Sequence, residues 1–531
     1  MWFAPDELTE AERDLLRPYV TNLDGPVFAL VNLPEVTKGA LFARYSRSPK
    51  SLRRLFLDEF AEHAEAAAAG ADVGTERAED LYGRVFYEYG DDSVAQLGGV
   101  HLACEQSSQL LAKVLERGRL AAYLEQSTRY VPYHDRPGGR WRYLIPPEVE
   151  AAGLEERYRA TLDRAFETYA RWLEPVQAFY REVSPKDPAD SDFVYRMSIR
   201  AKACDALRGL LPAATRSNVG IYATGQSYEQ LLLRMRAHPL EEVRAFADLM
   251  LIELRKVIPA FLRRVDVRER GVAWSTYLRA TREATQAVAD EALSEVEPEP
   301  RPEVVLTDFD PDGETKVVAA ALYAAGDQPD DQLLDAAARM SVEDRLRVLR
   351  AYVGERTNRR HRPGRAFERT AYRFDVLCDY GAFRDLQRHR PLTIDWQRLS
   401  PRHGYEMPRE IEEAGVYADW TRTMRESEEL WSALGRLGDV AQYAVAMAYR
   451  IRFVMDMNAR EAMHVIELRT TPQGHPVYRR VGQEMHRLIG EEAGHRAIAE
   501  AMRFADHSRV ELERLEAERR SDARRRALGT A

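Results

Sequence analysis

The chain has 531 residues, more than one compact core usually contains, so at least two domains are expected. Hydrophobic residues make up 45% and charged residues 31% of it, which is typical of a water-soluble globular protein. No apolar run reaches the roughly 18 residues of a membrane helix, and the net charge of -9 disfavours general nucleic-acid binding. We therefore expect a folded protein that binds neither membranes nor nucleic acids.

The N-terminus and the cysteines favour a cytoplasmic protein. The first residues lack the basic and apolar regions of a secretory signal peptide. Cys104, Cys204 and Cys378 are too far apart in the sequence for a disulfide framework or a thiolate zinc site. We expect no structural metal and treat the three cysteines as small core residues.

In chain order, the first predicted elements are a strand, a turn and a helix within 27–44. Apolar residues at i, i+3 and i+4 then predict a series of amphipathic helices. These helices span 52–68, 94–116, 154–182, 239–263, 424–451 and 476–503. A strand at 304–309 and a helix from Glu314 through Tyr323 come before the last two helices.

Residues 295–303 alternate acidic side chains with prolines, which interrupt both helices and sheets. We interpret this segment as an interdomain linker. The last residues, 509–531, form a charged tail that is either helical or disordered.

The two halves of the chain contain an internal duplication. Arg117-Gly-Arg119 corresponds to Arg388-His-Arg390 at an offset of 271 positions, and 89–93 corresponds to 360–364 at the same offset. Residues 226–236 resemble 458–469 at a shorter offset near 232, so the first half contains extra residues, which we place within 141–186. We predict a first repeat at 1–294 and a second at 304–508.

The segment 117–130 concentrates residues that bind nucleotides. It contains three arginines, a glutamate and a serine, and it ends in Tyr130. Guanidinium groups bind phosphate through paired charge-assisted hydrogen bonds, and a carboxylate can accept from a ring N–H or a ribose hydroxyl. The same residues would also suit a solvated helix with i, i+4 ion pairs.

This segment resembles the signature R-H-R-x-x-S-x-N-E-x-S-x-R-Y of the flavin-dependent thymidylate synthases. The matching residues are Arg117, Arg119, Glu125, Ser127, Arg129 and Tyr130, and the departures are Gly118, Ala122 and Leu124. The second repeat complements the first, because it restores Arg388-His389-Arg390. However, Asp395-Trp396 and Arg398 stand where the family has asparagine-glutamate and serine.

A second family signature is an arginine four residues before a proline, followed by N-x-R and L-x-L-R. The first repeat is similar at Arg208, four residues before Pro212, and at Arg236. The second repeat is similar at Asn458-Ala-Arg460 and at Arg469, while Gln442 replaces the equivalent of Arg208. The chain thus looks like a tandem, two-copy member of this family with partly degenerate motifs.

The resemblance implies an α+β fold that is predominantly helical, built from two repeats that each contain a small sheet and long helices. It also implies FAD as cofactor, dUMP as substrate, methylenetetrahydrofolate as one-carbon donor and NADPH as the reductant of the flavin. Because family members are homotetramers whose sites lie between subunits, we expect a homodimer of this tandem chain to mimic the tetramer.

The resemblance assigns site residues in three groups, which we expect the two repeats to share in one composite site. Arg236 and Arg469 are the candidates for stabilising negative charge on the uracil ring. The residues expected to bind the substrate are Arg117, Glu125, Ser127, Arg129 and Arg208. The residues expected to bind the flavin are Arg388, His389, Arg390, Asn458 and Arg460.

Three other interpretations stay open. The altered signature positions Ala122, Leu124, Trp396 and Arg398 would suit a catalytically degenerate flavin- or nucleotide-binding homologue without synthase activity. A second possibility is a different C5 modification of a pyrimidine nucleotide with another donor. The third is a helical scaffold protein whose arginines are ordinary solvated surface.

Overall fold

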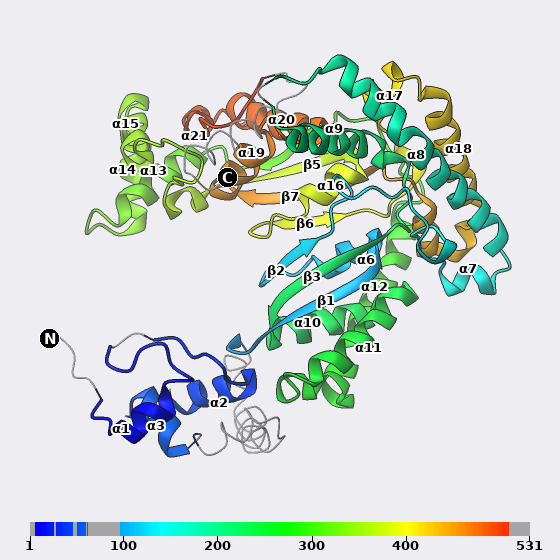
Figure 1. The fold of residues 1–531 in the computed structure, drawn as a ribbon. Coiled ribbons are helices and arrows are strands. Elements are labelled where there is room, and N and C mark those ends of the chain that lie inside the picture. The colour runs from blue at the N-terminus through cyan, green and yellow to red at the C-terminus, as the bar shows by residue number, and fades with distance from the viewer. Residues whose placement is uncertain are drawn as a thin grey trace. The chain divides into compact units, whose positions relative to one another are not determined.

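A computed structural model describes residues 6–25, 28–45, 50–59, 61, 96–188 and 190–508 (Figure 1). The chain divides into two compact units. Unit 1 comprises 1–107, 118–125 and 218–296, and unit 2 comprises 108–117, 126–217 and 297–531. Unit 2 therefore contains segments from both sides of the linker predicted at 295–303, and the repeat boundary stays a prediction about the sequence.

Unit 1 contains a three-stranded sheet in the order β1-β3-β2, and β2 pairs with β3 in antiparallel fashion. Its strands are β1 (Gly99–Ser108), β2 (Ala121–Glu125) and β3 (Arg216–Thr224). Buried side chains alternate with exposed ones along β3, as expected for a sheet with one covered face. Tyr228 of the following helix α10 (Gly225–Arg236) donates to the carbonyl oxygens of Val100 and Ile221, which fixes this helix to the sheet.

The other described helices of unit 1 follow α10 or precede the sheet. Helices α1, α2 and α3 form a small core of their own around Leu16, Leu55 and Phe56. The bounds are α1 (Glu10–Leu16), α2 (Glu35–Tyr45), α3 (Leu52–Glu59), α11 (Glu241–Arg255), η4 (Ala260–Asp266), η5 (Arg268–Val272) and α12 (Ala273–Ala292).

Unit 2 contains an antiparallel four-stranded sheet in the order β4-β5-β7-β6. The strands are β4 (Val304–Phe309), β5 (Ala371–Asp379), β6 (Thr393–Trp396) and β7 (Arg450–Asn458). Phe374, Val376, Phe453 and Met455 are buried on one face of this sheet. Helix α20 (Pro476–Glu491) packs against β4 and β5.

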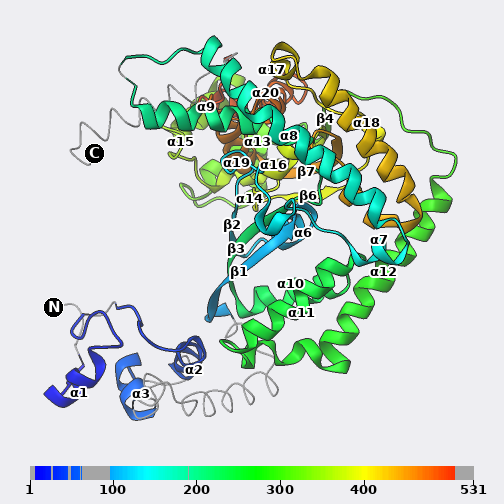
Figure 2. The same cartoon turned by 45° about the vertical axis from the view of Figure 1, so that its right-hand side comes forward.

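Helices from both halves of the sequence pack together in unit 2. The long helix α8 (Glu155–Val183) lies beside α18 (Tyr417–Ala433), as Figures 1 and 2 both show, and the Trp172 indole N–H donates to Asp419 at 2.7 Å. The other helical segments are α6 (Gln109–Leu115), η2 (Pro137–Gly139), α7 (Pro147–Ala151), α9 (Asp192–Leu207), η3 (Arg208–Leu210), α13 (Gly313–Tyr323), α14 (Asp330–Arg339), α15 (Val342–Val353), η6 (Arg365–Arg369), α16 (Tyr380–Leu386), η7 (Pro401–His403), α17 (Arg409–Glu413), η8 (Gly435–Ala444), α19 (Ala459–Arg469) and α21 (Arg496–Ala501).

The strand registers confirm that the fold consists of two repeats, each with a small sheet and helices. Tyr123 pairs with Ile221 between β2 and β3, and Ile394 pairs with Met455 between β6 and β7. The helix N-caps give the offsets: Ser108 of α6 corresponds to Asp379 of α16 at 271, and Thr224 of α10 corresponds to Asn458 of α19 at 234. The predicted offset near 232 is therefore wrong by two residues, because Gln226 was aligned with Asn458 in place of the helix N-cap Thr224.

Several predicted helices differ from the structure. The helix at 94–116 is wrong over its first part, which forms β1 before α6 begins at Gln109. The helix at 424–451 ends at Ala433, and Gly438 with a φ of 60° interrupts the segment before β7. Similarly, the helix predicted at 239–263 ends at Arg255. The helix predicted at 476–503 is divided into α20 and α21. The strand expected near 27–34 is reduced to one isolated bridge, between Val20 and Leu30.

Other predictions agree with the structure or fall outside its described residues. The helix at 154–182 corresponds to α8, and the strand at 304–309 followed by a helix corresponds to β4 and α13. Outside the described residues lie the loop 89–93, the end of the helix predicted at 52–68 and the tail 509–531. Among the described helices, none combines the length and the apolarity needed to cross a membrane.

Candidate functional site

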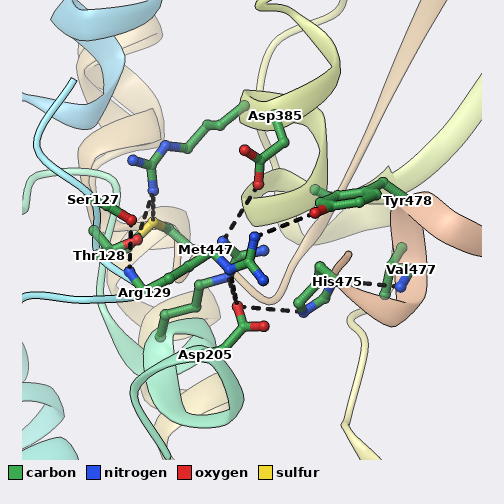
Figure 3. A network of polar contacts seen from close by, with 12 residues as sticks. Ser127, Thr128, Arg129, Asp205, Asp385, Met447, His475, Val477 and Tyr478 are labelled. Atoms are coloured by element: carbon green, nitrogen blue, oxygen red, sulfur yellow. Dashed lines mark hydrogen bonds and ion pairs between the residues drawn. The ribbon is translucent and has the colours of Figure 1, made fainter. Parts of the chain in front are cut away.

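A cluster of buried opposite charges occupies the interior of unit 2 (Figure 3). Asp205, near the end of α9, lies 3.1 Å from the Nε atom of Arg129 and 3.4 Å from that of Arg208. The three side chains are between 4% and 15% exposed. Arg129 also donates to the Tyr478 hydroxyl at 3.2 Å, so its guanidinium is held between α9 and α20.

Asp385, in α16, is the second carboxylate at this place. Its oxygens lie 3.7 Å from Arg208, 3.9 Å from Arg469 and 4.0 Å from Arg388. The charge of Arg129 also acts on it. We call the four arginines 129, 208, 388 and 469, together with Asp205 and Asp385, the arginine cluster.

Local structure explains how these side chains reach one another. Thr128 accepts a hydrogen bond from Arg384 at 3.3 Å, which holds the turn that carries Arg129. Arg208 caps the end of α9 and begins η3. A Cβ atom at Gly381 would lie 3.0 Å from the Nε atom of Arg208, so glycine at this position leaves room for the guanidinium.

The arginine cluster has more positive than negative charge. Burial alone would raise the pKa of Asp205 and Asp385, but the adjacent arginines hold both pKa values well below their usual range, so both carboxylates are ionised. Four guanidinium groups against two carboxylates leave two positive charges in excess. Burial lowers the pKa of His475, 3.9 Å from Asp205, to about 3, so this neutral ring does not change the balance.

A cavity of about 510 Å³ adjoins the cluster within unit 2. Asp205, Arg208 and His475 line it together with aromatic side chains that include Tyr180 and Trp420. A combination of polar and aromatic lining residues is typical of pockets for heterocyclic ligands.

Asp379 also lines this cavity, and a Cβ atom at Gly381 would lie close to both Asp379 and Arg208. Burial raises the pKa of Asp379 to about 7 despite the charge of Arg208, so this carboxyl group exchanges its proton near neutral pH. One of its oxygens accepts the backbone N–H of Ala382 and caps α16. The other oxygen has no hydrogen-bond partner among the described residues.

The family model for the thymidylate synthase complementing protein matches residues 40–260 and 305–493. The chain belongs to this family. Both repeats of the chain are matched, in agreement with the duplicated strand registers.

Three relatives are similar to the chain over nearly its whole length. The chain is 37% identical to the UPF0159 protein of Chlamydia muridarum over 97% of its own length and 99% of that protein. It is 38% identical to a UPF0159 protein of Chlamydia pneumoniae over 97% of this chain and 98% of that protein. A UPF0159 protein of Thermoplasma acidophilum is 29% identical over 92% and 99% of the two chains.

One solved structure is similar to a smaller part of the chain. It is a UMP/dUMP methylase from Streptomyces cacaoi bound with 5-Br dUMP, 20% identical, and the similarity covers 38% of this chain and 97% of that one. Its TM-score of 0.30 is too low to support a functional argument for this chain.

In this member of the family, the structure brings several of the predicted site residues together. Arg129 and Arg208 from the first half meet Arg388 and Arg469 from the second half in the arginine cluster. Arg469 donates from Nε to Nε2 of His389 at 2.9 Å, which joins this ring to the cluster. The predicted residue Ser127 lies in the same turn as Arg129 and accepts its backbone N–H at 3.3 Å.

Other predicted residues of this family member lie elsewhere. Glu125 and Arg236 belong to unit 1, where Arg236 pairs with Asp248 and Asp266. Because the true offset is 234, the equivalent of Arg469 is Met235 and not Arg236.

Four predicted residues of unit 2 are also outside the arginine cluster. Arg117 is half exposed and pairs with Asp395 at 2.6 Å. The Asn458 side chain caps α19, Arg460 donates to the Pro363 carbonyl at 3.0 Å, and Arg390 is exposed next to His389.

The sequence analysis missed Asp205 and Asp385, which are central to the cluster. A signal for them exists: each lies three residues before an arginine of the cluster, in Asp205-Ala-Leu-Arg208 and Asp385-Leu-Gln-Arg388. This spacing places the two charges on one helix face. Tyr478 carries no comparable signal, because it meets Arg129 only through the tertiary fold.

Proposed function

We propose that this chain is an FAD-dependent thymidylate synthase, which converts dUMP to dTMP with methylenetetrahydrofolate and NADPH. Membership of the thymidylate synthase complementing protein family supports this class of methyltransferase. The observation that carries the proposal is the arginine cluster, which is buried except for the partly exposed Arg388, contains residues of both repeats and has two positive charges in excess.

The charge of the cluster suits a nucleoside monophosphate. Leaving net charge in a protein interior is costly unless a counter-charge is supplied. A phosphate monoester carries up to two negative charges and accepts bidentate hydrogen bonds from guanidinium groups. Arg129 and Arg208 are the residues that we assign to the phosphate, and the cavity beside Arg208 has aromatic and polar walls for the base.

The donor set next to the cluster also fits an anionic flavin nucleotide. Arg388 and Arg390 are exposed at the end of α16, while His389 between them is buried. We assign these residues, with Asn458 and Arg460, to FAD. When bound, the reduced flavin supplies the hydride, and the chain contributes position and electrostatics.

We assign Arg469 to the stabilisation of the uracil ring. Attack by the C5 carbon of uracil builds negative charge on the ring oxygens, and a fixed guanidinium stabilises that charge as it develops. Burial lowers the pKa of Arg469, yet a guanidinium stays protonated in proteins, so the positive charge is present throughout. The arginine is enclosed by Asp385, His389 and Tyr478, which limit its motion.

The registers support one composite site per chain. At the structural offsets, Arg129 corresponds to Ser400, Arg208 to Gln442 and Arg469 to Met235, so three of the four guanidinium groups are replaced in the other repeat, whereas Arg388 corresponds to Arg117. A homodimer would then have two sites. We expect calorimetric titration of the purified protein to give one dUMP bound per chain, and two per chain would contradict the composite site.

The second candidate is a degenerate homologue that binds nucleotide or flavin without turnover. Asp205 and Asp385 favour this degenerate homologue, because the two carboxylates already neutralise half of the positive charge of the four arginines. Tritium release from C5-labelled dUMP, with NADPH and methylenetetrahydrofolate, separates the two candidates. Release supports the synthase, whereas nucleotide binding without release supports the degenerate homologue.

Substitution of Arg129 tests the site itself. We expect R129M to weaken dUMP binding about 10- to 100-fold, because a buried charge-assisted hydrogen bond is lost. The matched control is R350M, whose arginine is 65% exposed in a surface pair with Glu500. If R129M binds dUMP as tightly as R350M and the parent protein, and the purified protein lacks the flavin absorption band, the proposed function is wrong.

A further inference from the structure

A row of polar side chains extends from α19 to the arginine cluster. The Glu461 carboxylate lies 3.4 Å from Nδ1 of His389 and 3.3 Å from Nδ1 of His464. On its other side, His389 accepts the Nε–H of Arg469 at 2.9 Å. Glu461 and His389 are 5% and 4% exposed, so solvent does not screen these interactions.

The charge on Arg469 fixes the tautomer of His389. A guanidinium nitrogen can only donate, so Nε2 of the ring must offer its lone pair. Burial lowers the pKa of His389 to about 4, and the neutral ring therefore carries its single hydrogen on Nδ1, facing Glu461. Burial alone would raise the pKa of Glu461, but hydrogen bonds with His389 and His464 lower it to about 2, so the acceptor is ionised.

The same three residues have the spacing of a metal site, but their surroundings oppose one. Ligand atoms of His389, Glu461 and His464 lie within 4.8 Å of one another. A metal ion on Nδ1 of His389 would move the ring hydrogen to Nε2, directly opposite the Nε–H of Arg469. Metal-bound histidines normally donate that hydrogen to an acceptor. Two donors would face each other here, and the guanidinium charge would repel the cation.

We infer that Glu461 and His464 are positioning residues, which fix the guanidinium of Arg469 through the ring of His389. Glu461 orients the ring by accepting from Nδ1, and the ring holds the Nε atom of Arg469. This leaves the terminal nitrogen Nη1 of Arg469 3.9 Å from Asp385, with the Tyr478 ring centroid 5.5 Å from the guanidinium carbon.

The inference rests on the proposed function, in which Arg469 stabilises charge on the uracil ring. A donor that is fixed before the reaction stabilises the transition state without reorganising during it. The loss of Glu461 would therefore reduce the rate of the chemical step and leave the binding of the ground-state substrate nearly unchanged.

The experiment compares E461A, E461Q and the control E484Q, whose glutamate pairs with Arg487 on the surface of α20. We expect E461A to lower kcat for dTMP formation about 10- to 100-fold, with KM for dUMP changed less than about threefold. E461Q keeps an acceptor for Nδ1–H and should retain more activity than E461A. An E461A kcat equal to that of E484Q overturns the inference.

The tautomer of His389 provides a measurement that does not require turnover. With ring-labelled histidine, 15N NMR should report Nδ1–H for His389 in the parent protein, assigned by comparison with H389N. We expect E461Q to keep this tautomer and E461A to lose it. If the parent protein neither binds nor converts dUMP, the proposed function fails while this measurement still decides the positioning role.

Zinc titration closes the remaining alternative. We expect no tightly bound equivalent of Zn²⁺ in the purified protein, because a metal-bound His389 would direct its ring N–H at the Nε–H of Arg469. A stoichiometric zinc site that H464A abolishes would overturn the inference and assign the three residues to a metal centre.

Discussion

Replacement of Asp385 by asparagine should have opposite effects on stability and on ligand binding. In the parent protein, Asp385 lies 3.7 to 4.0 Å from Arg208, Arg388 and Arg469. Without its charge, the excess in the arginine cluster grows from two positive charges to three. We therefore expect D385N to be less stable without ligand and to bind a phosphate monoester more tightly.

The distances set the magnitude of the stability loss. Each arginine at about 4 Å gives a gross attraction of about 4 kcal/mol at an effective dielectric constant of 20, which the desolvation of Asp385 largely offsets. Removing one partner of a buried ion pair typically costs about 3–5 kcal/mol. None of the three separations is a hydrogen-bonding distance, so we expect the lower end, about 3 kcal/mol.

Urea unfolding, followed by tryptophan fluorescence, measures this loss. Trp420 is buried in unit 2, and its emission should follow the transition of that unit. Because the chain has two compact units, the transitions must be fitted separately. The control is E500Q, which removes an exposed partner of Arg350 and should cost less than about 1 kcal/mol.

Added dUMP then tests the second half of the prediction. Its stabilisation of D385N should exceed that of the parent protein, since stabilisation grows with the ratio of ligand concentration to Kd. The reasoning is refuted if D385N is as stable as E500Q without ligand, or if dUMP protects D385N less than it protects the parent protein.

Two further predictions concern packing and pH. At Gly209, a Cβ atom would lie 2.6 Å from the Trp420 ring. We therefore expect G209A to lower the free energy of unfolding of unit 2 by about 1–3 kcal/mol, measured as a lower urea midpoint. Burial lowers the pKa of His389 to about 4 and of His475 to about 3, so the unfolded chain binds more protons and stability falls from pH 6.5 towards pH 4. Asp379 has the opposite effect, because its pKa is raised to about 7 and the folded chain therefore binds its proton more readily than the unfolded chain. The two histidines outweigh this one carboxyl group, so stability should still fall. A urea midpoint at pH 5 that equals or exceeds the midpoint at pH 7 would contradict this prediction.

The sequence predicted the duplication and the family better than it predicted the strands. Arg117-Gly-Arg119 and Arg388-His-Arg390 gave the offset of 271 that the N-caps of α6 and α16, Ser108 and Asp379, confirm. By contrast, β1 was predicted as a helix. Its apolar residues at Val100, Ala103 and Cys104 also satisfy helical spacing, and no proline separates the strand from α6.

The arginines of the site could be found from family signatures, but their partners could not. Arg129 and Arg208 lie in motifs with fixed spacing, whereas Asp205 and Asp385 are defined by what surrounds them after folding. Arg236 was assigned a role from an alignment displaced by two residues, and its guanidinium pairs with acidic side chains of unit 1, so its role stays a prediction.

Duplication within one chain explains how the two repeats could become unequal. In a homotetramer every subunit carries the same substitution, so losing an arginine would damage all the sites at once. In a tandem chain, Arg129 and its counterpart Ser400 change independently, and the same holds for Arg208 and Gln442. A composite site needs only one good copy of each element. The other copy is then free to lose its guanidinium groups, and S400R alone should not create a second nucleotide site, because Gln442 and Met235 would still lack the charge.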